Sequence, residues 1–244
     1  MPVPWLDDDP HAPFPPATRA LGDPDGLLAA GGDLSPTRLL NAYRNGIFPW
    51  FSDGQPILWW SPDPRWVFRT DVLHLSRRFI RTLRNSTWTV RADTAFAEVV
   101  AACAHSPREG QRGTWITAAM QNAYCELHRL GHAHSIEVFD GTQLVGGLYG
   151  VAIGRMFFGE SMFSGDSGAS KCALAGLAHR LGQWGWPLID AQVGNPHLVR
   201  LGAESWPRAT FLSRVAELTA IPEPAQSWSG RFGTIAVGQL AGVP

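Results

Sequence analysis

In the first half of the chain, apolar side chains recur every three or four positions, which predicts amphipathic helices. The segments with this spacing are 71–84, 93–105 and 117–130. A shorter helix is expected over 35–46, because Ser35 can cap its N-terminus, Pro36 suits its first turn and Gly46 ends it. Asp93 is expected to cap the helix that follows it.

The second half is dominated by segments typical of strands. Three of them follow one another, joined by Asp-Gly and Gly-Arg turns, and predict an antiparallel meander over 134–140, 143–153 and 155–163. A small-residue loop, SGDSGASK, leads into a helix, and a strand over 187–193 follows, with helices near 196–202 and 207–219. Handedness rules allow this strand to return beside the meander. We therefore expect an α+β fold with a mostly antiparallel central sheet flanked by helices.

The first part of the chain differs from the rest. Residues 1–62 are loop-rich, and aromatic side chains crowd its end at Phe48, Trp50, Phe51, Trp59 and Trp60. The string SPDP has the composition of a linker, and a strand, RWVFRT, follows it. We predict a small N-terminal domain over 1–62 and a larger domain over 63–244.

Composition excludes several classes of protein. The 244 residues are 45% hydrophobic with a net charge of −1, so global charge indicates neither a nucleic-acid nor a membrane protein. The three cysteines are scattered and the histidines show no metal-ligand spacing, so neither a disulfide framework nor a metal site is expected. The N-terminus lacks the apolar core of a signal peptide, and no run approaches the length of a membrane span. These features favour a cytoplasmic protein.

Two carboxylates and an amide are the first candidates for chemistry. Asp190 and Gln192 lie in the string PLIDAQV and share one face of the expected strand. An unpaired buried carboxylate is costly, so Asp190 either pairs with an arginine or a helix end, or serves a reaction. Glu160 ends the third meander strand, where a half-solvated structural role is the alternative. If the two strands are neighbours, the three side chains converge on a site for acyl or proton transfer.

Positive charge is concentrated in one segment. Seven arginines accompany one acid, Asp71, between residues 65 and 91: Arg65, Arg69, Arg77, Arg78, Arg81, Arg84 and Arg91. This local patch is sufficient to meet an RNA backbone, although a solvated helix face is the ordinary explanation. SGDSGASK lies at a helix N-terminus, which favours an anion, but Asp166 opposes phosphate and an ordinary helix-entry loop is preferred.

Aromatic residues offer a further surface. Trp50, Trp115 and Tyr124 either belong to a core or stack on unpaired bases.

Several long strings resemble the leucyl/phenylalanyl-tRNA–protein transferase family. They run in order from about residue 20 to 215 and include GGDLSPTRLLNAYRNGIFPWFS, ILWWSPDPR, GTWIT, GHAHSIEV, LVGGLYG, FFGESMFS, ASK and LIDAQ followed by LGA. The resemblance implies a bacterial cytoplasmic enzyme with a GNAT-type acyltransferase domain. It would transfer leucine or phenylalanine, with methionine as a further donor, from aminoacyl-tRNA to proteins with N-terminal Arg or Lys, marking them for N-end-rule degradation. We expect a monomer without cofactor or metal.

The resemblance also implies residue roles. The catalytic group corresponds to Asp190, Gln192 and Glu160, and the tRNA 3′-adenosine site to Trp50, Trp115 and Tyr124. The side-chain pocket corresponds to Leu148, Phe157, Met162, Leu174, Leu177, Leu181 and Ile189. The tRNA backbone would be met by Arg77, Arg78, Arg81 and Arg84.

An aminoacyl-tRNA is already an activated ester, so the reaction needs mainly a neutral amine held against the carbonyl. Gln192 is expected to hydrogen-bond the amine, and Asp190 to orient Gln192 and stabilise the developing ammonium. Glu160 is expected either to attract the acceptor's cationic side chain or to hold the tRNA end. Two other functions remain open at this stage: a CoA-dependent N-acetyltransferase, and an RNA- or peptide-binding module without catalysis.

Overall fold

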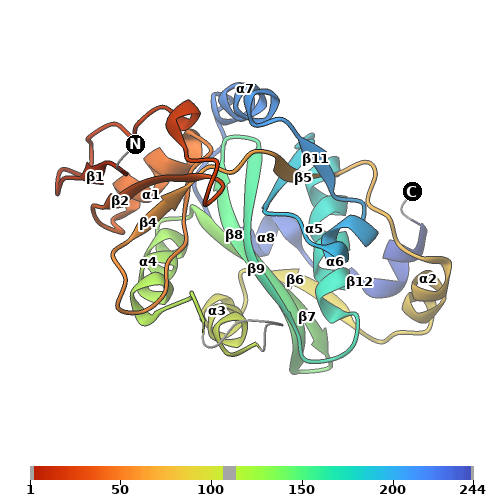
Figure 1. Cartoon of the computed structure of the whole chain (residues 1–244). Helices are drawn as coiled ribbons and strands as arrows, with labels where there is room; N and C mark the ends of the chain where they lie inside the picture. Colours follow the sequence, from red (N-terminus) through yellow and green to blue (C-terminus); the bar gives the residue numbers. More distant parts are fainter. Residues whose placement is uncertain (1–2, 107–113, 243–244) are drawn as a thin grey trace.

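The computed structural model describes residues 3–106 and 114–242, and these form two β-sheets with helices around them (Figure 1). The smaller sheet has the order β1-β2-β4-β3, with β1 Trp5–Leu6, β2 Leu27–Gly31, β3 Phe48–Pro49 and β4 Leu58–Trp60. The larger sheet has the order β11-β5-β10-β9-β8-β7-β6-β12. Its strands are β5 Arg65–Arg69, β6 Thr89–Ala92, β7 Ala133–Asp140, β8 Gln143–Ile153, β9 Met156–Ser164, β10 Leu188–Gln192, β11 Glu204–Trp206 and β12 Ile235–Ala236.

Antiparallel pairing dominates the larger sheet, as the sequence predicts. The three long strands β7, β8 and β9 form the expected meander, and β10 returns beside β9 in the parallel direction. The fold is therefore α+β with a mostly antiparallel central sheet.

Helices cover both faces of the larger sheet (Figure 1). They are α1 Pro36–Arg44, α2 Arg77–Arg84, α3 Phe96–His105, α4 Ala118–Arg129, α5 Ala169–Gln183, α6 Pro196–Arg200, α7 Arg208–Thr219 and α8 Ser229–Phe232, with 3₁₀ helices η1 Ala17–Arg19 and η2 Val237–Gly242. One apolar cluster joins α1, α3, α4, α7 and the smaller sheet to one face. A second cluster joins α5, α8 and η2 to the other. Within the described residues, no helix combines the length and the apolar character that a membrane span requires.

The smaller sheet shares a core with the larger one. Tyr43 of α1 lies 5.3 Å from Phe158 of β9, measured between ring centres, and Trp59 belongs to the same buried cluster. The boundary between residues 62 and 63 stays a prediction.

Two predicted helix starts are wrong. Residues 71–76 are not helical, because α2 begins at Arg77 and Ser76 caps it, accepting a hydrogen bond from the backbone N–H of Phe79. Asp93 does not cap α3, which begins at Phe96 without a side-chain cap. Instead the Asp93 carboxylate binds His134 at 2.9 Å and the backbone N–H of Trp228 at 2.6 Å, which ties the C-terminal segment to β7.

Candidate active site

A cavity of about 810 Å³ opens where two strands of the larger sheet stop pairing. The parallel register of β9 and β10 covers Met156–Phe158 and Leu188–Asp190, and β9 then continues alone on this side to Ser164. Glu160 and Gln192 lie just beyond the last paired residues, and both line the cavity. The size is typical of a small-molecule or cofactor site.

One wall of the cavity is apolar. Six of the seven side chains predicted for the aminoacyl pocket line it: Leu148, Phe157, Met162, Leu174, Leu177 and Ile189. Leu181, the seventh, lies outside the lining, fully buried in the core of α5. Leu181 lies about one helical turn beyond Leu177, where α5 packs against the core and no longer borders the cavity.

Two of the three predicted aromatic residues also line the cavity. Trp50 follows β3 and Trp115 precedes α4, and both are half-buried. The backbone carbonyl of Trp50 accepts a hydrogen bond from the Trp60 indole at 2.7 Å, which holds this loop in place. Tyr124 is fully buried outside the cavity lining, so its ring has no face to offer a base.

Asp190 is paired with an arginine. Both side chains are nearly inaccessible, and Arg65 of β5 donates from Nε and Nη2 to the two Asp190 oxygens at 2.8 and 2.6 Å. The guanidinium lies 4.7 Å from the ring centres of Phe48 and Phe211, and it donates to the carbonyl of Gly46 at 3.1 Å. A buried carboxylate is stable here because a bidentate partner neutralises it.

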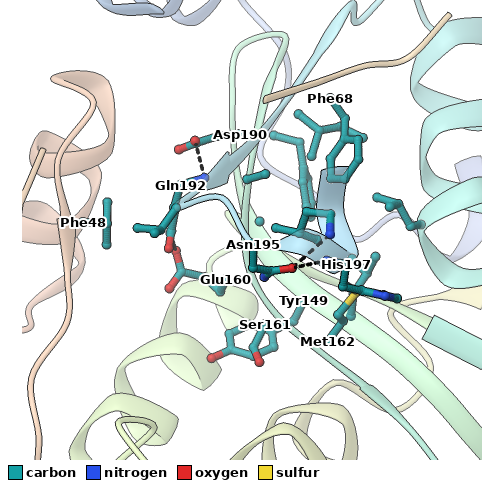
Figure 2. A pocket seen from close by; sticks show the side chains of 18 of the residues that line it. Phe48, Phe68, Tyr149, Glu160, Ser161, Met162, Asp190, Gln192, Asn195 and His197 are labelled. Carbon is teal, nitrogen blue, oxygen red and sulfur yellow. Dashed lines mark hydrogen bonds between the residues drawn. The ribbon is translucent and has the colours of Figure 1, made fainter. Parts of the chain in front are cut away.

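Asp190 also fixes Gln192, but through the backbone. Its Oδ1 accepts a hydrogen bond from the Gln192 backbone N–H at 2.9 Å, shown dashed in Figure 2. The strand bulges between the two residues, and Gln192 adopts a left-handed φ of 58°. A positive φ is strained for a glutamine, so it persists only where the surrounding contacts hold the backbone. Asp190 therefore contacts Gln192 through its backbone N–H, while the Gln192 side-chain amide binds another group.

That group is Glu160. The Gln192 Nε2 donates to Glu160 Oε1 at 2.7 Å, and the same oxygen accepts from the Tyr43 hydroxyl at 2.7 Å. Tyr124 reaches Glu160 Oε2 at 2.7 Å, and the two tyrosine hydroxyls are 2.6 Å apart. Tyr43, Tyr124 and Glu160 thus form a closed ring of three short contacts, which we call the Tyr–Tyr–Glu ring.

Counting protons in the Tyr–Tyr–Glu ring assigns one to Glu160. If Glu160 is ionised, both tyrosines donate to it and no proton remains between their hydroxyls, which would then repel. With a proton on Glu160, every contact in the ring carries one. Burial raises the pKa of Glu160 to about 7 against the opposing hydrogen bonds, so Glu160 carries this proton below neutrality and loses it as pH rises through 7. Burial also raises the pKa of Tyr43 and Tyr124 well above the usual value, so both hydroxyls stay neutral.

The four predicted tRNA-backbone arginines lie away from the cavity lining. Arg77, Arg78, Arg81 and Arg84 are exposed on α2, and they form no ion pair within the described part of the chain.

Two important residues were not singled out from the sequence. Tyr43 lies on the buried face of α1, and Arg65 was grouped with the exposed arginines although it is buried. For Arg65, the string RWVFR holds no local signal, because its strand also ends in an arginine, Arg69, which is exposed. In residues 3–106 and 114–242, no cluster of histidine, cysteine and acidic side chains is arranged to hold a metal ion.

The cavity has an apolar wall and ends in a hydrogen-bonded carboxyl and amide where β9 and β10 stop pairing, an arrangement that suits an enzyme of the group-transfer class. The family model described as leucyl/phenylalanyl-tRNA protein transferase matches residues 67–216, and the model of its N-terminal domain matches residues 32–63. The chain belongs to the leucyl/phenylalanyl-tRNA–protein transferase family.

Relatives that bear this name are similar over nearly their whole length. The protein from Xanthomonas campestris pv. campestris (strain B100) is 69% identical over 238 residues, which cover 98% of this chain and 96% of the relative. The protein from Xylella fastidiosa (strain M23) is 66% identical over 228 residues, covering 93% and 94%. Among solved structures, a functionally unknown conserved protein from Staphylococcus epidermidis ATCC 12228 matches with a TM-score of 0.41 and 8% identity, covering 74% of this chain and 68% of that one.

Proposed function

We propose that this protein transfers leucine or phenylalanine from aminoacyl-tRNA to the α-amino group of an acceptor protein. One observation carries the proposal beyond the family name: a single cavity joins the apolar wall, the two tryptophans and the polar end formed by Gln192 and Glu160. The apolar wall suits a leucine or phenylalanine side chain. Trp50 and Trp115 offer ring surfaces on which the terminal adenosine can stack.

The chemistry requires positioning more than activation. The amine nitrogen forms a bond to the ester carbonyl carbon, the bond to the ribose oxygen breaks, and an amine proton passes to that oxygen. An α-amino group has a pKa of about 7.7–8.0, so a fraction of it is neutral near pH 7. Because the Gln192 Nε2 is engaged by Glu160, its carbonyl oxygen is the atom left to accept an N–H of the amine. Asp190 acts as a positioning residue that holds the Gln192 backbone.

The acceptor is proposed to begin with Arg or Lys, which matches a role of this enzyme in N-end-rule degradation. Glu160 titrates near neutrality, so its ionised fraction can attract a cationic acceptor side chain at the polar end of the cavity. Methionine is proposed as a third donor, because a flexible unbranched chain also fits an apolar wall. The α2 arginines are proposed to meet the tRNA backbone.

We further propose that residues 63–244 form a GNAT-type acyltransferase domain and residues 1–62 a small N-terminal domain, in a monomeric cytoplasmic enzyme. The parallel pairing of β9 with β10 at the end of an antiparallel meander, and the cavity where that pairing stops, support the GNAT-type assignment. The separate smaller sheet supports the domain division.

A transfer assay tests the function. Purified protein is mixed with radiolabelled leucyl-tRNA and two model peptides, one beginning with Arg and one with Asp, without ATP or CoA. We expect label on the Arg peptide alone. Label on neither peptide, with the charged tRNA intact, would overturn the proposal. Label on both would retain the transferase and overturn the acceptor rule.

A further inference from the structure

The cations around the cavity mouth lack the carboxylate partners that many arginines have elsewhere. Ion pairs within the described residues engage Arg38, Arg65, Arg69, Arg129, Arg155, Arg208, Arg214 and Arg231. Lys171 and Arg200 form none there. Their charge is therefore available to a ligand.

Two cationic or titratable side chains line the cavity, and a third, Lys171, lies outside its lining within electrostatic reach of them. Arg200 and His197, both on α6, line the cavity, and Lys171 lies in the first turn of α5. Burial and then the charges of Lys171 and Arg200 lower the pKa of His197, so the three groups are within electrostatic reach of one another. His197 and Met162 are both labelled among the lining side chains in Figure 2. We call Lys171, His197 and Arg200 the cationic rim.

The cationic rim adjoins the basic helix α2. The Lys171 ammonium lies 5.4 Å from the ring centre of Phe79 on α2. The segment that enters α2 is bonded to the end of α6, because the backbone N–H of His74 donates to the carbonyl of Leu201 at 3.0 Å. Of the acids nearby in sequence, Asp71 is already paired with Arg69 at 2.8 Å, and Asp166 is exposed in the loop before α5. Unpaired positive charge thus extends from α2 to the cavity.

We propose that the cationic rim binds the phosphodiester groups of the unpaired 3′ end of the tRNA, between the basic helix and the adenosine site. This proposal rests on the proposed function. The last nucleotides of a tRNA are single-stranded, and their phosphates must approach the cavity for the terminal adenosine to enter it. Lys171 and Arg200 supply charge, and a neutral His197 supplies an N–H donor.

The donor substrate separates this role from catalysis. Leucyl-tRNA carries phosphates, whereas 2′(3′)-O-leucyladenosine carries the same ester without any. For the variant Lys171→Ala/Arg200→Ala, we expect kcat/KM with leucyl-tRNA to fall at least tenfold more than kcat/KM with leucyladenosine. The dependence of log affinity on log salt for tRNA should become shallower by about 1.4, or about 0.7 for each lost cation on a single strand.

A matched control removes two other cations. Arg19 and Arg44 are exposed, have no ion pair in the described chain and lie outside this cavity, so Arg19→Ala/Arg44→Ala should leave both donors within about twofold of wild type. Equal losses with the two donors would overturn the proposal, as would unchanged use of leucyl-tRNA by the cationic-rim variant. If Arg19→Ala/Arg44→Ala lost as much activity as the cationic-rim variant, the loss would be a general effect of charge, and the proposal would also be overturned. Failure of the wild-type protein with both donors would instead refute the proposed function.

Discussion

Replacing Arg65 with methionine tests whether Asp190 positions Gln192 or takes part directly in the reaction. The pair is buried and bidentate, and removing one partner of such a pair costs about 3–5 kcal/mol, since the other charge stays buried alone. The lost contacts with Phe48 and Phe211 add about 1 kcal/mol. The total of about 4–6 kcal/mol is a large part of the stability of an ordinary domain. Asp190→Asn should cost a similar amount, because it leaves the guanidinium unpaired.

The double variant Arg65→Met/Asp190→Asn removes both charges and should recover several kcal/mol relative to the sum of the single variants. The assay is denaturant unfolding of all three variants, with leucine transfer measured at a temperature where each is folded. Arg65 lies outside the cavity lining, yet Arg65→Met should reduce transfer as Asp190→Asn does, since each loosens the support of Gln192. Our reasoning is refuted if Asp190→Asn keeps wild-type stability and loses transfer while folded Arg65→Met retains it.

Three further predictions concern the cavity. Glu160→Gln keeps a donor and an acceptor in the Tyr–Tyr–Glu ring but cannot ionise. The pKa of Glu160 is about 7 in the folded protein and 4.5 in the unfolded chain, so the wild type loses stability as pH rises between these values. From pH 5 to pH 8, the free energy of unfolding of the variant in urea should therefore rise by up to about 3 kcal/mol relative to wild type. A difference that stays constant with pH would contradict the protonated ring. Leu177→Ala enlarges the apolar wall, so the ratio of kcat/KM for phenylalanine over leucine should rise about tenfold, and a fall would place the side chain elsewhere. Trp115→Ala should raise KM for charged tRNA roughly tenfold with kcat nearly unchanged, through lost stacking, and an unchanged KM would remove Trp115 from the adenosine site.

Local signals predicted the elements whose causes are local. Helix α1 is capped by Ser35 as expected, and the turn at Asp140-Gly141 joins β7 to β8. Handedness rules allowed β10 to lie beside the meander, where it pairs with β9, and six of the seven apolar side chains that the resemblance assigned to the aminoacyl pocket line the cavity wall. Asp93 shows the limit of local rules. It stands where a cap is expected, but its partners come from β7 and from the distant segment at Trp228.

The part of the site that sequence reasoning missed depends on contacts between distant residues. Arg65 and Asp190 are separated by 125 positions, and nothing local distinguishes Arg65 from the exposed Arg69 at the other end of its own strand. Tyr43 also has its partner far away in the sequence, since its hydroxyl donates to Glu160 across 117 positions. Alternation along a strand placed Asp190 and Gln192 on one face, but it does not foresee a bulge between them.

These distant contacts make the N-terminal segment part of the active site. Tyr43 contributes a hydroxyl to the Tyr–Tyr–Glu ring, and the Gly46 carbonyl accepts from Arg65, so both supports of Gln192 begin in residues 36–46. One support runs through Glu160 to the Gln192 side chain, and the other through Arg65 and Asp190 to its backbone. A left-handed residue with an aimed amide needs both, because either alone would leave the side chain or the backbone free to relax. The shared core between the two sheets therefore fixes the orientation of Gln192, the group that we propose meets the amine.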